Sequence, residues 1–286
     1  MALFIRRMIA LFRAARLALH LGYGLTLAIS YPWLRATLQR RILQRWSNDL
    51  LNIFGIQVRM NAGMQSCKLQ QGLIVTNHIS WLDVFVLNSV VPMRFVAKSE
   101  VRRWPVIGWL CARAQTLFIE RGKARSAARI NVQLVELLKR GECLAVFPEG
   151  TTTNGAEVAH FHSSLLQPAI DSGVPLHPIA IRYQNKSGQR SDAAAYIDHL
   201  SFGASLWQIL CAKNLQVRLV ATPSLDTRNT NRRALTLNAH THIASTLLAL
   251  DDESYPVHSD EQDDYLQSLY NELLVAMLET NASYRH

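Results

Sequence analysis

The sequence predicts an α/β protein in which a mixed β-sheet is flanked by helices and preceded by a membrane-associated helical segment. Three observations support this prediction. Short apolar runs alternate with longer helical patterns from Gly55 onward, which is typical of an α/β domain. The 286 residues are 49% hydrophobic and 18% charged, so a substantial core is expected and a disordered polyelectrolyte is excluded. Residues 1–59 hold nine Arg and one acidic residue, which indicates a basic N-terminal surface.

The first sixteen residues have the pattern of an amphipathic helix. Plotted at 100° per residue, one face carries Phe4, Ile5, Met8, Ile9, Leu11 and Phe12, and the other carries Arg6, Arg7, Arg13 and Arg16. This pattern is typical of a helix in the membrane interface, with its arginines toward anionic head groups. The chain has no run of five basic residues, so we expect membrane lipids as a partner and no nucleic acid.

The next apolar run, Leu17 to Ser30, has 14 residues, fewer than the roughly 20 that cross a bilayer. Three interpretations stay open: a monotopic helical hairpin that turns near Gly22 and Gly24, a single tilted span, and a cleaved signal peptide. The pattern over residues 33–46 fits a helix on the core and a helix on the membrane equally well. We expect the protein at the cytoplasmic face of a bacterial inner membrane, monotopic or with one span.

The rest of the chain divides into an α/β domain over residues 51–250 and an acidic helical extension over 251–286, after the N-terminal helices of residues 1–50. Strands are expected over 57–60, 72–76, 94–97, 116–119, 143–147, 176–182 and 216–221, and helices over 80–89, 126–139, 231–249 and 265–278. The cysteines are Cys67, Cys111, Cys143 and Cys211. Their spacing offers no local zinc site, and we expect small, buried, reduced side chains.

A histidine and an aspartate follow the second strand, in Asn77-His78-Ile79-Ser80-Trp81-Leu82-Asp83. Ligands bind at strand ends of open α/β sheets. Asp83 fits the first turn of a helix capped by Ser80, and this simpler interpretation leaves His78 without a role. A general base needs one ring nitrogen held by a carboxylate and the other free to take a proton. The sequence therefore predicts a His78–Asp83 catalytic pair.

Three further segments lie at strand ends. Phe118-Ile119-Glu120-Arg121-Gly122 places an acidic–basic pair after the fourth strand. Phe147-Pro148-Glu149-Gly150-Thr151 follows a strongly apolar strand, and its turn, hydroxyl and backbone N–H groups suit an oxygen-rich ligand. Val174-Pro175-Leu176-His177-Pro178 opens the sixth strand with two prolines.

In this order, the four segments resemble the lysophospholipid acyltransferase family, which includes the bacterial 1-acyl-glycerol-3-phosphate acyltransferases. The resemblance covers about residues 70–185. It implies the family's glycerol-phosphate-acyltransferase-like fold, an acyl-CoA or acyl-carrier-protein donor, a lysolipid acceptor, and no cofactor or metal. It also implies that His78 is the base and Asp83 its partner, with substrate-binding roles for Asn77, Ser80, Arg121, Glu149, Gly150 and Thr151.

The expected reaction is acyl transfer to 1-acyl-glycerol-3-phosphate, which gives phosphatidic acid. Many glycerol-phosphate members carry Arg or Ser at Thr152 and Lys at His162, so the phosphate end here has fewer potential cations. The alternative acceptor is therefore lyso-ornithine lipid, an aminolipid without phosphate. A catalytically silent membrane-binding module is a further alternative. A serine hydrolase is disfavoured, because the chain has no G-x-S-x-G elbow.

Overall fold

The computed structural model describes the chain except for residues 1, 67–70, 121–123, 198–199 and 252–286. Its helices are α1 (Ala2–Ser30), α2 (Ala36–Phe54), α3 (Ala62–Ser66), α4 (Asp83–Val90), α5 (Ile107–Arg113), α6 (Ala124–Lys139), α7 (Gln167–Ser172), α8 (Phe202–Cys211) and α9 (Arg232–Asp251). Its strands are β1 (Gln57–Met60), β2 (Gly72–Thr76), β3 (Arg94–Lys98), β4 (Leu117–Ile119), β5 (Cys143–Val146), β6 (Leu176–Gln184) and β7 (Gln216–Ala221). The helix expected over 265–278 lies outside the described residues.

The strands form one seven-stranded sheet in the order β1-β7-β6-β2-β5-β3-β4. Neighbouring strands run parallel except β6 and β7, which are antiparallel, so the predicted mixed sheet is confirmed. Because β2 and β5 are parallel neighbours, the turns that follow Thr76 and Val146 emerge at the same edge of the sheet. The predicted catalytic histidine and the Glu149 turn are brought together at this edge.

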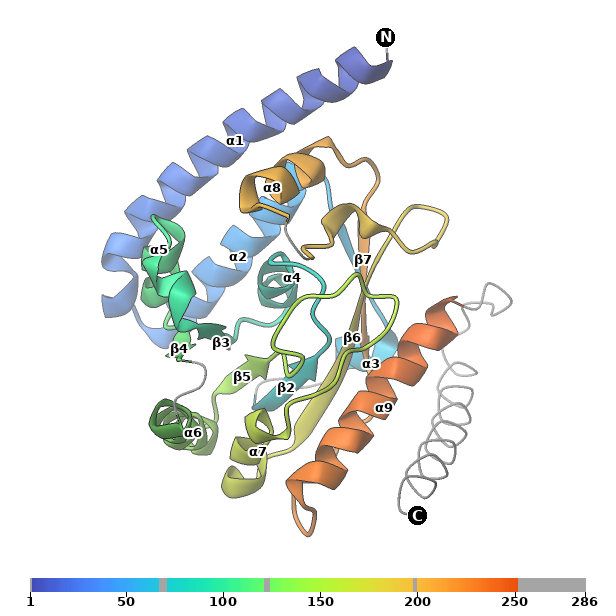
Figure 1. The fold of residues 1–286 in the computed structure, drawn as a ribbon. Coiled ribbons are helices and arrows are strands. Elements are labelled where there is room, and N and C mark those ends of the chain that lie inside the picture. The colour runs from blue at the N-terminus through green and yellow to red at the C-terminus, as the bar shows by residue number, and fades with distance from the viewer. Residues whose placement is uncertain (1, 67–70, 121–123, 198–199, 252–286) are drawn as a thin grey trace.

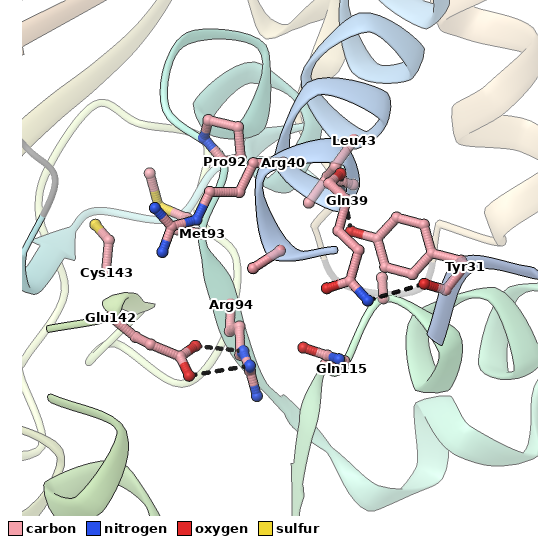
Figure 2. Close-up of a pocket in the computed structure, with 12 residues that line it drawn as sticks. Tyr31, Gln39, Arg40, Leu43, Pro92, Met93, Arg94, Gln115, Glu142 and Cys143 are labelled. Atoms are coloured by element: carbon pink, nitrogen blue, oxygen red, sulfur yellow. Dashed lines mark hydrogen bonds and ion pairs between the residues drawn. The ribbon is translucent and has the colours of Figure 1, made fainter. Parts of the chain in front are cut away.

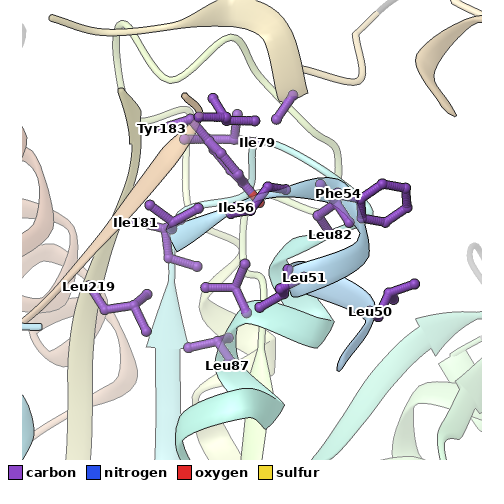
Figure 3. Packing of buried hydrophobic residues seen from close by; sticks show 14 of the residues in the cluster. Leu50, Leu51, Phe54, Ile56, Ile79, Leu82, Leu87, Ile181, Tyr183 and Leu219 are labelled. Atoms are coloured by element: carbon purple, nitrogen blue, oxygen red, sulfur yellow. The ribbon is translucent and has the colours of Figure 1, made fainter. Parts of the chain in front are cut away.

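Each face of the sheet has its own hydrophobic core. One core lies beneath α1, α2, α4 and α8, and the other lies beneath α6, α7 and α9 (Figure 1). Successive side chains of β6 point to opposite faces of the sheet, so this strand contributes to both cores. Ile181 and Tyr183 pack in the first core, and Ala180 packs in the second. Figure 3 shows Ile181 and Tyr183 in the first core, which they share with Leu51 of α2 and Leu87 of α4.

The N-terminal helix is continuous from Ala2 to Ser30, so one of the three open interpretations, the hairpin that turns near Gly22 and Gly24, is wrong. Gly24 instead makes room for an aromatic side chain, because a Cβ on this residue would lie 2.7 Å from Trp46 Nε1. The chain turns later, in a short 3₁₀ segment that contains Pro32, and then enters α2. Over the described residues, each helix is too short or too polar to cross a bilayer.

Arg13 is not directed toward lipid head groups as predicted. Its Nη1 donates to the carbonyl oxygens of Leu210 at 2.9 Å and Ala212 at 2.7 Å. These carbonyls lie at the C-terminal end of α8, where a cation satisfies unpaired acceptors and opposes the negative end of the helix dipole. Ala10 and Leu17 are buried on the same side of α1. The helix is therefore packed onto the catalytic domain along this stripe.

The apolar face predicted for α1 is exposed: Phe4 and Phe12 keep 68% and 64% of their surfaces accessible. The residues of the pattern over 33–46 divide between surface and core. Trp33 and Leu38 are exposed, whereas Trp46 packs against the first core. The cysteine expectation holds in part. Cys143 is buried, Cys111 and Cys211 are half-buried, and Cys67 lies outside the described residues.

Candidate active site

His78 and Asp83 form a hydrogen-bonded pair at the carboxyl edge of the sheet. His78 is in the turn after β2, and Asp83 is the first residue of α4. His78 Nδ1 lies 2.8 Å from Asp83 Oδ2, and the side chains are 19% and 0% exposed. Since the carboxylate accepts, the ring proton is on Nδ1 and the basic lone pair is on Nε2. In the described part of the chain, no group hydrogen-bonds this Nε2, so it is available to an incoming hydroxyl.

Asp83 also holds the backbone of the turn. Its Oδ2 accepts hydrogen bonds from the N–H groups of Ile79 at 2.8 Å and Ser80 at 2.9 Å. Helix α4 begins at Asp83 with Leu82 as its N-cap, so the predicted cap by Ser80 is wrong. The predicted first-turn position of Asp83 and its orienting role therefore coexist in one carboxylate. This geometry places His78 by its backbone and its ring at the same time.

Tyr183 completes the support of this carboxylate. Its hydroxyl donates to Asp83 Oδ1 at 2.8 Å from the middle of the core. Burial, reinforced by the negative charge of Asp83, raises the pKa of Tyr183 well above its ordinary value, so the hydroxyl stays a donor. Sequence reasoning missed this residue. The available signal was a hydroxyl-bearing aromatic in a strand expected to be buried, because a buried Tyr needs a partner for its O–H.

An aromatic ring from the neighbouring strand holds the imidazole from one face. Phe147, which follows β5, stacks on His78 with 3.9 Å between ring centroids and 17° between planes. Phe95 of β3 continues the stack behind Phe147 at 5.9 Å. The ring of His78 is thus held in place by stacking on Phe147 as well as by the hydrogen bond to Asp83.

Glu149 is buried and binds two backbone N–H groups. Its Oε1 accepts from His78 N at 2.7 Å, and its Oε2 accepts from Ala159 N at 3.1 Å. Burial raises the pKa of Glu149 to about 7, although both hydrogen bonds oppose the shift. The contacts support a positioning role that ties the catalytic turn to the segment 150–162. Gly150, at φ +66°, turns the chain away from this carboxylate, and Thr151 is exposed at the rim.

Asn77 and Ser80, predicted to bind substrate, are engaged inside the protein. Asn77 Nδ2 donates to Ile181 O at 2.9 Å, and Asn77 Oδ1 accepts from Ile181 N at 2.8 Å. Ser80 is fully buried, and its Oγ accepts from Leu82 N at 3.3 Å. These contacts position the turn and give no support to direct substrate binding by either residue. Arg121, the predicted phosphate contact, lies outside the described residues.

A separate pocket of about 120 Å³ lies far from His78. Figure 2 shows its lining, where Arg94 pairs with Glu142 through an Nε–Oε2 distance of 2.7 Å and Gln39 binds Tyr31. Arg94 and Cys143 are the first residues of β3 and β5, whereas His78 follows the last residue of the parallel strand β2. The pocket is therefore at the opposite edge of the sheet from the His78–Asp83 pair.

Comparisons with known proteins agree with this geometry. The acyltransferase family matches residues 58–182, which include the His78, Glu149 and β6 segments. The chain is 35% identical over 240 residues to a lyso-ornithine lipid O-acyltransferase from Pseudomonas aeruginosa, covering 82% of this chain and 91% of that protein. It is 37% identical over 147 residues to a 1-acyl-sn-glycerol-3-phosphate acyltransferase from Neisseria meningitidis, covering 51% of this chain and 57% of that protein.

Among solved structures, the fold is similar to that of the 1-acyl-sn-glycerophosphate acyltransferase from Thermotoga maritima. The TM-score is 0.66 at 18% identity, and the match covers 90% of this chain and all of that one. This likeness supports the fold alone. The extent of the match to the Pseudomonas protein, together with the matched family segment and the His78–Asp83 pair, shows that the chain belongs to the acyltransferase family.

Proposed function

We propose that this protein transfers a fatty acyl group from acyl-CoA or acyl carrier protein to the free hydroxyl of 1-acyl-glycerol-3-phosphate, which gives phosphatidic acid. The observation that carries the proposal is the His78–Asp83 pair, with Nδ1 bound and Nε2 available at the carboxyl edge of the sheet. The similarity to 1-acyl-sn-glycerol-3-phosphate acyltransferases of two Neisseria species supports this acceptor.

The chemistry is direct transfer in which His78 acts first as base and then as acid. Its Nε2 takes the proton of the acceptor hydroxyl while the hydroxyl oxygen attacks the thioester carbonyl carbon. The C–O bond forms and the C–S bond breaks, and the leaving thiolate receives the proton from His78. Asp83 stabilises the imidazolium between the two proton transfers, and Tyr183 holds Asp83 in place.

The test is an acyl-transfer assay with the purified full chain, a labelled acyl donor and a panel of lysolipids. We expect labelled phosphatidic acid from lysophosphatidic acid, formed about 10²–10⁴ times more slowly by the His78→Ala variant. Parallel reactions with acyl-CoA and acyl carrier protein identify the donor. Wild-type protein that acylates no lysophosphatidic acid under either donor would contradict the proposed acceptor.

Lyso-ornithine lipid is the second candidate acceptor, and two observations favour it. The chain covers 91% of a Pseudomonas protein named as a lyso-ornithine lipid O-acyltransferase. In addition, Thr152 and His162 supply no fixed positive charge, and the Thr152 hydroxyl is hydrogen-bonded to the carbonyl oxygen of Tyr196. Arg121→Ala separates the two: it should raise the KM for lysophosphatidic acid strongly, because Arg binds phosphate bidentately, and Arg121→Lys should restore it only in part.

We propose that the protein associates with the cytoplasmic face of a bacterial inner membrane as a monotopic enzyme. The exposed apolar side chains of α1, together with its exposed arginines, support this location. The donors in this reaction are cytosolic, whereas the lysolipid acceptor is held in the leaflet. A helix that lies in the interface would place the catalytic domain between the two substrates.

A further inference from the structure

Three arginines form a row across one end of the sheet. Arg182 of β6 lies directly opposite Arg218 of β7, and Arg218 is the register partner of Arg59 in β1. The neighbouring residues Ala180 and Val220 belong to the core beneath α9, so these side chains share the α9 face. We call Arg59, Arg182 and Arg218 the arginine row. Like charges directly opposite on paired strands are destabilising, so the row needs an explanation.

The buried member of the row has unused hydrogen-bond donors. The Arg182 side chain is 5% exposed, and its Nη2 donates to Asp251 Oδ1 at 2.7 Å and to Gly188 O at 3.3 Å. Its Nε and Nη1 are also buried, and neither has a hydrogen-bond partner among the residues that the structure describes. Burial and the positive charges of Arg218 and Arg190 lower the pKa of Arg182. A buried donor without a hydrogen-bond partner destabilises the folded state, and more so when the group is charged, so anionic oxygen atoms that accept from these donors would be stabilising.

The chain itself carries such oxygen atoms next to the row. Asp251, the last residue of α9, is followed directly by Asp252 and Glu253, and residues 251–286 hold nine Asp/Glu and one Arg. Because Asp251 is already bonded to Arg182, the next two carboxylates are tethered within about 7 Å of backbone. Because the tether is so short, the effective concentration of these carboxylates at the arginine row is very high, and a free anion in solution competes with them poorly.

We propose that the acidic C-terminal segment of this chain binds the arginine row, with the carboxylates of Asp252 and Glu253 as its principal contacts. Carboxylates match the fork of guanidinium donors, so these two groups would satisfy Arg182 and neutralise Arg218. Arg182 lies between Ile181, which binds the amide of Asn77, and Tyr183, which binds Asp83. By binding Arg182, the segment would stabilise strand β6, which positions the catalytic pair.

A double-mutant cycle in the full chain tests this proposal. The variants are Arg218→Gln, the pair Asp252→Asn/Glu253→Gln, and their combination, each unfolded in urea. Arg218 is chosen because it is half-buried, whereas Arg182 is buried. Replacing Arg218 therefore tests the row and leaves the buried Arg182 side chain in place. We expect the effects of the two sets of substitutions on the unfolding equilibrium constant to deviate from additivity by at least about fivefold. Salt should make this deviation smaller, because it screens the interaction between the charges. Two control cycles are matched to this one. In the first, Arg232→Gln replaces Arg218→Gln, and in the second, Glu272→Gln/Glu279→Gln replaces the Asp252/Glu253 pair. In both control cycles the effects on the unfolding equilibrium constant should be additive.

An Arg218 cycle that is additive within about twofold would overturn the proposal. The decisive second measurement is the unfolding midpoint in millimolar pyrophosphate. We expect pyrophosphate to leave the wild-type midpoint unchanged, because the row is already occupied. A midpoint that pyrophosphate raises in the wild type and not in Arg218→Gln, combined with an additive cycle, would assign the row to a soluble polyanion instead.

Discussion

Tyr183 binds one oxygen of the Asp83 carboxylate at 2.8 Å, while His78 binds the other oxygen at the same distance. The two partners come from different places: Tyr183 is 100 residues from Asp83 and belongs to the central strand β6, whereas His78 is five residues away in the same turn. The orientation of the catalytic imidazole therefore depends on the register between β6 and β2, and not only on the local turn.

We predict that Tyr183→Phe lowers kcat with little change in KM, because Asp83 loses a donor and holds the imidazolium less well. The unfolding free energy should fall by about 1–3 kcal/mol, because a buried carboxylate oxygen is left unpaired. Steady-state kinetics and urea unfolding check both effects. Tyr23→Phe, at an exposed position of α1, is the matched control and should change neither. Equal kcat in Tyr183→Phe and wild type would contradict the positioning role.

His78→Ala should lower the rate of acyl transfer by about 10²–10⁴, the usual effect of losing a general base. The fold should persist, because the residue is in a turn at the edge of the sheet, and circular dichroism tests this. His160→Ala is the control, since this histidine is exposed. Retention of more than about half of the wild-type kcat by His78→Ala would contradict the assignment.

Asp83→Asn separates orientation from capping. The amide oxygen can still accept from the N–H groups of Ile79 and Ser80, so the start of α4 should survive. The neutral amide cannot stabilise the imidazolium, so kcat should fall by at least about tenfold. Kinetics and helical content by circular dichroism are measured on the same sample. A benign Asp83→Asn would reduce Asp83 to a helix cap.

Glu149 should make stability depend on pH. Its pKa is raised by burial from 4.5 to about 7, so its contribution to stability is full below pH 4.5 and is lost as the pH rises through about 7. Glu149→Gln removes this titration, at a constant cost from one lost backbone hydrogen bond. Relative to wild type, the variant should gain about 3 kcal/mol between about pH 4.5 and 8.

Urea unfolding across this pH range checks the difference. Glu157→Gln, at an exposed position in the same segment, should follow the wild-type profile throughout. Parallel pH profiles for Glu149→Gln and wild type would mean that Glu149 does not titrate in this window in the folded protein.

Replacing Phe4 and Phe12 with serine should weaken binding to anionic vesicles by at least about tenfold, because burial of each ring contributes about 1.5–3 kcal/mol. Co-sedimentation with vesicles measures the effect. Val132→Ser, which removes an exposed apolar side chain from α6, is the control and should bind normally. Unchanged sedimentation of the double variant would contradict interfacial binding through α1.

The strands were predictable because most are short apolar runs between turn residues, and β1, β2 and β7 have the predicted bounds. Four helices were missed. Three of them, α3, α5 and α7, have five to seven residues, too few to show a helical period. The fourth, α8, carries no charged residue, so it lacks the polar face by which an amphipathic helix is recognised.

At the site, the His78–Asp83 pair was predictable because both partners belong to one turn. The roles of Tyr183, Asn77 and Glu149 depend on strand pairing and on a loop that folds back, and no local pattern shows these. The N-terminal errors have a similar cause. A glycine in a helical pattern can mark a turn of the chain, or it can leave room for a neighbouring aromatic ring, as Gly24 does for Trp46. The hydrophobic periodicity of the sequence does not distinguish these two roles.

The bonds from Arg13 to the end of α8 make helix α1 part of the folded enzyme. A surface that binds the exposed face of α1 consequently binds the native state in preference to the unfolded chain. By linkage, a bilayer of suitable composition acts as a stabilising ligand, and the melting temperature should rise with lipid concentration. Deleting residues 1–46 would remove the anchor and part of the core together, so only substitutions on the outer face can report on lipid binding alone.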